Sequence, residues 1–150
     1  MREELISSLS VCGFSMSFIG KGRFIEEENF SLSGNDCSLG LKVFYGRGKY
    51  LKPWAEIFNI KGKFFGFGIE SSLYRSLLSF SWIFVEYILD RETTFELDRG
   101  KKPEETRLGK VLLSCGYRSL KDWYFPEGWM EGGPKMQAFA PLQGRDFVLK

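Results

Sequence analysis

Apolar and polar residues alternate between Phe14 and Ile60, a pattern typical of β-strands that bury one face. Turn residues interrupt the alternation at 33–36 and again at 46–48. This segment is therefore expected to form successive antiparallel strands, preceded by a short helix. The predicted bounds are 3–10 for the helix and 23–32, 38–45 and 50–60 for the strands.

The period of the pattern changes after residue 68. Ile69, Leu73, Leu77 and Phe80 recur at helical spacing, which predicts a helix over 70–81. The elements expected after it are a buried strand at 82–89, a charged loop at 91–102, a helix at 104–115, a strand at 117–125, a Gly-rich loop at 126–134, and short strands near 135–140 and 145–149.

This order predicts one domain over residues 1–150, of the α+β or α/β class, with helices packed on a mixed, mainly antiparallel twisted sheet. A strand, a crossover helix and a second strand normally make a parallel pair. We therefore expect 50–60 and 82–89 to be parallel neighbours joined by the helix 70–81. The main cleft is expected where these two strands part at their C-terminal ends.

Composition narrows the possible chemistry. Hydrophobic residues make up 43% of the 150 residues, which is ample for a buried core. The absence of histidine excludes Ser-His-Asp and Cys-His catalysis and any His-ligated metal. The three cysteines are widely spaced and lack a CxxC motif, which favours reduced thiols over a disulfide framework or a metal site.

Charge and targeting signals point to a cytoplasmic protein. The net charge of +2 gives no bulk preference for nucleic acid. No signal peptide is recognised, and the apolar run 77–89 contains Glu86 and is too short to span a bilayer, so no membrane association is expected. The few Asn and Gln residues beside many charged ones suggest a heat-adapted source.

The segment 60–78 combines the end of a strand, a loop punctuated by glycine and an amphipathic helix. Such a helix start can hold a phosphate, because its first amides lack partners and its dipole favours an anion.

Residues 57–73, with the sequence IFNIKGKFFGFGIESSL, resemble motif A of the GNAT superfamily of acyl-CoA-dependent N-acetyltransferases. The helix 104–115 and the pair Gly116-Tyr117 resemble motif B, so the similarity covers residues 50–125. Residues 121–135 also resemble a small, mostly archaeal, uncharacterised family associated with this superfamily.

The resemblance implies a GNAT-like fold and binding of acetyl-CoA or coenzyme A. In one frame Gly68 is the first loop glycine, while Phe65 and Glu70 replace the usual Arg or Gln and the final Gly or Ala. A shifted frame puts Lys63, Gly66 and Gly68 in the three key loop places. The cofactor-binding residues implied are Ile60, Lys63, Gly66, Gly68, Ser71 and Ser72.

The resemblance also implies transfer of an acyl group to a small-molecule or protein amine. Glu56, on the strand before the loop, and Glu86, in an apolar strand, are the candidate bases. The family's helix Tyr aligns with Leu112, so no general acid is assigned.

The aromatic residues Trp123, Tyr124 and Trp129 lie among carboxylates and are candidates for binding a cationic amine. They would equally serve to fix a long hairpin to the core.

Two alternative functions remain open from the sequence. The segment 63–68, KFFGFG, is similar to an aromatic RNA-binding strand motif and is flanked by basic residues, as in a single-stranded nucleic-acid-binding module. A structural or interaction domain that kept the fold and lost the cofactor is the other, because fold does not imply function.

Overall fold

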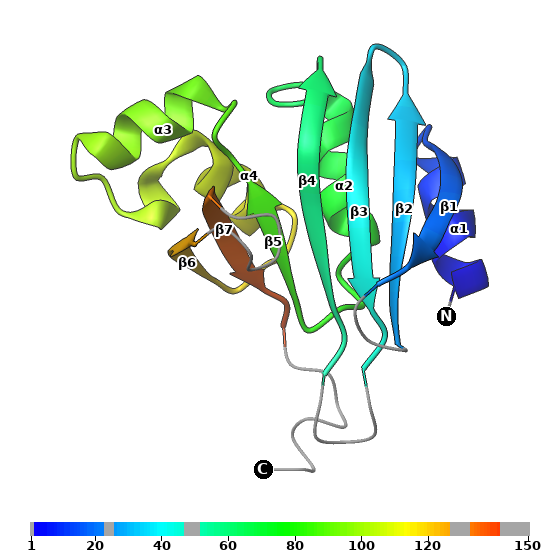
Figure 1. Cartoon of the computed structure of the whole chain (residues 1–150). Coiled ribbons are helices and arrows are strands. Elements are labelled where there is room, and N and C mark those ends of the chain that lie inside the picture. Colours follow the sequence, from blue (N-terminus) through cyan, green and yellow to red (C-terminus); the bar gives the residue numbers. More distant parts are fainter. Residues whose placement is uncertain (1, 23–25, 47–51, 127–132, 142–150) are drawn as a thin grey trace.

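The computed structural model describes residues 2–22, 26–46, 52–126 and 133–141 (Figure 1). These residues form a mixed α+β structure with a mostly antiparallel sheet of seven strands and four α-helices. The elements in chain order are α1 (Arg2–Val11), β1 (Ser15–Lys21), β2 (Glu27–Gly34), β3 (Cys37–Phe44), β4 (Trp54–Gly62), α2 (Gly68–Ser76), β5 (Trp82–Glu86), α3 (Arg91–Asp98), a 3₁₀ turn (Pro103–Glu105), α4 (Arg107–Ser114), β6 (Ser119–Phe125) and β7 (Gly133–Phe139).

The strands are ordered β1-β2-β3-β4-β5-β7-β6. β4 and β5 run parallel, in register from Trp54 opposite Trp82 to Ile57 opposite Val85, and α2 connects them. The other neighbouring pairs of described strands are antiparallel. The predicted parallel pair and its crossover helix are therefore confirmed. β7 is inserted between β5 and β6, so the last described strand of the chain lies inside the sheet.

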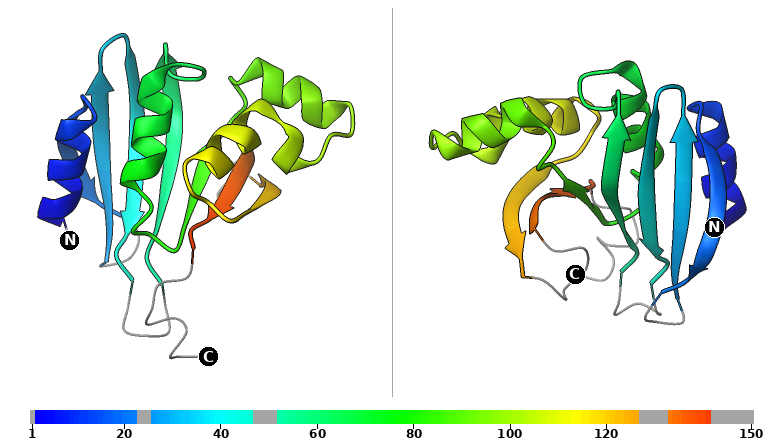
Figure 2. Two further views of the ribbon diagram at one scale, coloured as in Figure 1. Left: turned by 180° about the vertical axis from the view of Figure 1, so that it is seen from behind. Right: turned by 45° about the horizontal axis from the view of Figure 1, so that its top comes forward.

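The helices α1 and α2 lie side by side on one face of the sheet, with α4 beyond α2 (Figure 2). Alternate residues of β4 and β5 face these helices, and Ala55, Ile57, Ile83 and Val85 are fully buried in the core there. The intervening residues face the opposite side of the sheet. Glu56 and Glu86 belong to this second set, so strand alternation places both carboxylates away from the helices.

Most predicted elements are present, although their ends lie at other residues than predicted. The prediction of a charged loop is wrong for the segment 91–102. Its first part is the helix α3, which Asp90 caps by accepting from the backbone N–H of Thr93. Only Thr93 of this helix is buried, so its sequence has no apolar stripe that would predict a helix. The helix predicted at 104–115 divides into a 3₁₀ turn and α4. The strand expected near 145–149 lies outside the described residues.

Candidate functional site

The parallel strands β4 and β5 separate at a bulge in β4. Their pairing ends at Ile57 and Val85, while β4 continues to Gly62. The register between β3 and β4 shifts at this level, and Asn59 takes a left-handed conformation with φ of 51°. The backbone N–H of Asn59 donates to Glu86 Oε1 across the gap at 3.2 Å. A carboxylate therefore stands at the point where the two strands part.

Three charged side chains meet on the sheet face that is turned away from α1 and α2. Lys135 of β7 contacts Glu56 of β4, with Nζ 2.7 Å from Oε2, and its Nζ is 3.6 Å from Glu86 Oε2. The side chains of Lys135 and Glu56 are fully buried, whereas that of Glu86 is 19% exposed. One ammonium is therefore shared by two carboxylates. Glu86 is the solvent-accessible member of the cluster and can bind a cationic ligand.

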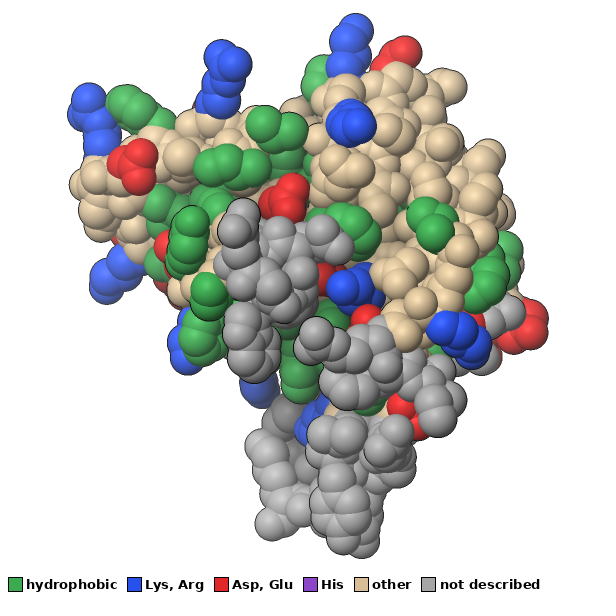
Figure 3. Space-filling view, in the orientation of Figure 1, with side chains coloured by type: hydrophobic (Ala, Val, Ile, Leu, Met, Phe, Trp, Pro, Cys, Tyr) green, Lys and Arg blue, Asp and Glu red, His purple; other side chains and the backbone are tan. Residues whose placement is uncertain are grey.

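Aromatic rings form a continuous row beside this cluster. Successive centroids along Phe44, Trp54, Phe84, Phe125 and Trp123 lie 6.0, 5.9, 5.5 and 6.1 Å apart. Figure 3 shows this side of the molecule, where hydrophobic, acidic and basic side chains lie near one another. Phe44 and Phe84 are buried in this row, whereas Trp123 is 38% exposed, so Trp123 is a ring that an organic cation can contact.

Trp123, one of the three residues predicted to bind a substrate amine, belongs to this row. Its indole Nε1 donates to Gln137 Oε1 at 2.7 Å, and the Lys121 ammonium lies 4.3 Å from the centre of one of its rings. Tyr124 follows it on the strand, so its side chain points to the other face, where it is 77% exposed. Trp129, the third predicted residue, lies outside the described residues.

The predicted cofactor-binding residues are distributed around the start of α2. Lys63, Gly66 and Gly68 are exposed in the loop and at the first position of the helix, and Phe67 provides no side-chain cap. Ile60 is buried in the core. Ser71 and Ser72 lie on α2, where their backbone carbonyls accept from Cys115 and Cys12.

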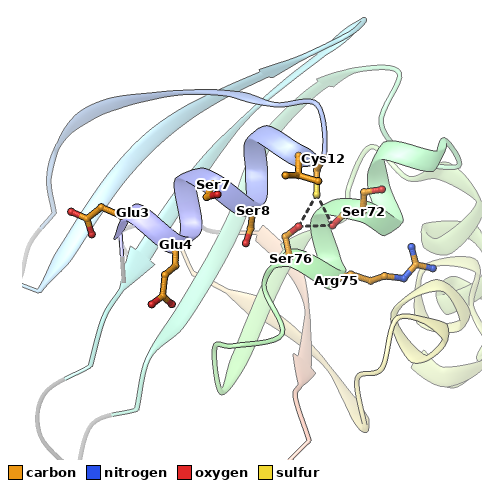
Figure 4. A pocket seen from close by; sticks show the side chains of 9 residues that line it. Glu3, Glu4, Ser7, Ser8, Cys12, Ser72, Arg75 and Ser76 are labelled. Carbon is orange, nitrogen blue, oxygen red and sulfur yellow. Dashed lines mark hydrogen bonds between the residues drawn. The ribbon is translucent and has the colours of Figure 1, made fainter.

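Two adjoining pockets lie on the helix side of the sheet. One, of about 770 Å³, lies between α1 and α2, where Cys12 approaches Ser72 and Ser76 (Figure 4). The other, of about 520 Å³, reaches the start of α2 and is lined by Lys63 and Phe67. The cleft expected between β4 and β5 is not among these pockets, which are lined by described residues.

The loop before α2 differs from the coenzyme A site that the resemblance implies, because two of its amides are already used. A pyrophosphate there needs free backbone amides. The amide of Gly66 donates instead to Glu70 Oε1 at 2.8 Å, and that of Lys63 donates to the carbonyl of Asp36. The carboxylate of Glu70 thus occupies the place of an anionic ligand.

The aromatic motif of the nucleic-acid alternative lies in this same loop instead of on a strand. Phe64 is fully buried and packs against Phe65 and Tyr74, whereas Phe67 is about half exposed. A buried ring cannot stack on a base. The geometry therefore offers one exposed ring of this motif, Phe67, for such a contact.

The cysteines are free thiols throughout the chain. Burial raises the pKa of both Cys37 and Cys115, which disfavours the reactive thiolate form. Among the described residues no group of three acidic or thiol side chains is placed to hold a metal ion. Nor does any helix of this part of the chain have the length and apolarity to cross a membrane.

Two residues of these sites were missed by sequence reasoning. Lys135 joins the acidic cluster because β7 is inserted next to β5, and no sequence pattern reveals that insertion. Arg107 reaches Glu70 from 37 positions further along the chain. Neither residue lies in a recognisable motif, so the fold is the only signal that identifies them.

These features define a mixed α+β protein with one parallel strand pair and an acidic cluster beside it. Residues 13–147 match the family described as a protein of unknown function (DUF1122), and the chain belongs to this family. It is similar to a protein of unknown function, AQ1966 from Aquifex aeolicus VF5, whose crystal structure is solved. The two chains share 44% sequence identity and a TM-score of 0.74, over 89% of this chain and 75% of that one. No curated protein matches the chain.

Proposed function

We propose that this protein is an N-acyltransferase that moves an acyl group from a thioester to an amine bound beside Glu86. The observation that carries the proposal is the cluster of Glu56, Glu86 and Lys135 at the point where β4 and β5 part. The sequence resemblance to the GNAT superfamily and the predicted parallel pair support the same reaction class.

In the proposed reaction Glu86 is the general base. Its carboxylate reaches solvent, accepts a proton from the bound ammonium group, and leaves a neutral amine. The amine nitrogen attacks the thioester carbonyl, a C–N bond forms and the C–S bond breaks. The second proton lost by nitrogen ends on the departing thiolate. Alignment of the two reactants supplies much of the rate enhancement.

Glu56 and Lys135 have a supporting role in this proposal. Both side chains are fully buried, so they do not touch the amine directly. The Lys135 ammonium holds the two carboxylates together and offsets part of the repulsion between them. Glu56 is therefore a positioning residue, and Glu86 is the residue that exchanges the proton.

The experiment measures thiol release from acetyl-CoA and from S-acetylpantetheine with a panel of alkylamines, polyamines and lysine peptides. Glu86→Gln keeps an acceptor oxygen for the Asn59 amide but cannot take a proton. We expect this variant to lower kcat by about 100-fold, with little change in the KM of the thioester. Glu92→Gln, on the exposed start of α3, is the matched control and should retain full activity.

A non-catalytic interaction domain is the second candidate, favoured by the complete burial of Glu56 and Lys135. It predicts no thiol release with any amine, and a change in stability as the sole consequence of substitutions in the cluster. Equal activity of Glu86→Gln and the wild type would also count against the acyltransferase proposal.

A further inference from the structure

The carboxylate of Glu70 has a complete set of hydrogen-bond donors. Oε1 accepts from the Gly66 backbone N–H at 2.8 Å and from Arg107 Nη1 at 2.9 Å. Oε2 accepts from the Tyr74 hydroxyl and from Arg107 Nη2, each at 2.8 Å. An ionised carboxylate offers about four acceptor sites, and all of them are used here.

These donors come from three different parts of the fold. Gly66 belongs to the loop before α2, Tyr74 to α2, and Arg107 to the first position of α4. Glu70 is itself in the first turn of α2 and is 1% exposed. A main-chain amide, a guanidinium and the positive end of a helix are the groups that bind a phosphate in other proteins. Here they converge on a side chain of the same protein.

The local charge also opposes a second anion. Arg107 Nη2 contacts Asp90 Oδ2 at 2.7 Å in addition to Glu70, so one guanidinium faces two buried carboxylates. The three groups together carry a charge of −1. A pyrophosphate brought to this loop would lose solvation and meet a like charge.

We infer that Glu70 is the resident anion of the loop before α2, and that the protein does not hold the pyrophosphate of coenzyme A there. The consequence for the acyl donor rests on the proposed function. The protein then recognises the donor through its acyl and pantetheine parts. A pantetheine thioester that lacks the nucleotide is therefore a sufficient donor.

The first test needs no enzymatic activity. Glu70→Ala frees the Gly66 amide and the Arg107 guanidinium, whereas Glu70→Gln removes the same charge and keeps an acceptor in place. With inorganic pyrophosphate in excess, Glu70→Ala should gain about 4 °C in Tm, while the wild type and Glu70→Gln should gain little. Calorimetric titration should give an affinity for pyrophosphate at least about tenfold higher for Glu70→Ala than for the wild type.

Wild-type binding as tight as that of Glu70→Ala would overturn the inference. If Glu70→Ala does not fold alone, folding in the presence of pyrophosphate supports the inference. Failure to fold in its presence, together with pyrophosphate binding by Glu70→Gln, refutes it.

The second test compares donors. The wild type should use S-acetylpantetheine and acetyl-CoA with kcat/KM values within about threefold of each other, and Glu70→Ala should favour acetyl-CoA by about tenfold. A strong wild-type preference for acetyl-CoA would refute the donor part of the inference. Absence of turnover with both donors refutes the proposed function alone, since pyrophosphate binding still tests the role of Glu70.

Discussion

At the scale of single residues, Lys135 is the side chain on which the acidic cluster depends. Its ammonium is fully buried and faces Glu56 at 2.7 Å and Glu86 at 3.6 Å. Lys135→Met would leave two neighbouring carboxylates without this cation, so we expect the free energy of unfolding to fall by about 4 kcal/mol. Urea denaturation at neutral pH measures this change.

A double variant separates the loss of the charge from the loss of packing. Glu56→Gln combined with Lys135→Met removes the carboxylate together with its partner, and should recover at least about 1 kcal/mol relative to Lys135→Met. Strictly additive effects of the two substitutions would show that the pair is not energetically coupled.

At the scale of elements, Asp90 connects α3 to α4. It caps α3 through Thr93, whose hydroxyl donates to Asp90 Oδ2 at 2.7 Å, and it pairs with Arg107 of α4. Asp90→Ala removes both contacts and should lower the free energy of unfolding by about 3 kcal/mol. Thr106→Ala removes the cap of α4 and the hydrogen bond from the Thr106 hydroxyl to the Pro103 carbonyl, and should cost about 1 kcal/mol.

Hydrogen exchange locates the effect. The amides of α3 should exchange faster in Asp90→Ala than in Asp90→Asn, which keeps a capping oxygen but loses the charge. Equal exchange in the two variants would mean that the cap contributes nothing to α3.

Elements of this protein were predictable where a periodic pattern set them. The stripe of Leu73 and Leu77 identified α2, and its position between two apolar strands identified the parallel pair. The helix α3 was missed because Phe95, its one large aromatic side chain, is 56% exposed. The residue that marks the start of α3 is its N-cap, Asp90, which does not stand out among the charged residues that follow it.

The candidate site was only half predictable for a different reason. Glu56 and Glu86 lie on two strands that the sequence identified as parallel neighbours. Lys135 reaches Glu56 and Glu86 through the order of the strands, and Arg107 reaches Glu70 through the packing of the helices. Both arrangements bring together positions that are far apart in the chain. No local pattern encodes such pairs, because the burial that creates them is a property of the whole sheet.

At the scale of the whole molecule, three buried tyrosines cause the free energy of unfolding to decrease at alkaline pH. Burial raises the pKa of Tyr74, Tyr87 and Tyr117, and the nearby carboxylates of Glu70 and Asp122 raise those of the first two further. The folded state therefore holds these phenol protons more tightly than the unfolded chain does. Their stabilisation is complete below pH ~10, where the unfolded chain keeps its protons, and is lost as pH rises above that value.

Each such tyrosine should lower the free energy of unfolding by about 1.4 kcal/mol per pH unit above pH ~10. Urea denaturation across this range, with phenolate absorbance followed in parallel, measures the slope. Tyr87→Phe should reduce the slope by one tyrosine's share. Stability that stays constant to pH ~11 would contradict the assignment.

The insertion of β7 between β5 and β6 has a consequence for how the chain matures. The strands β1 to β4 are each paired with a sequence neighbour, so this half of the sheet can assemble while synthesis continues. β6 cannot join β5 until residues 133–139 have left the ribosome, because its partner in the sheet is β7. Until then Glu56 and Glu86 lack Lys135, so the acidic cluster forms only after β7 has been synthesised.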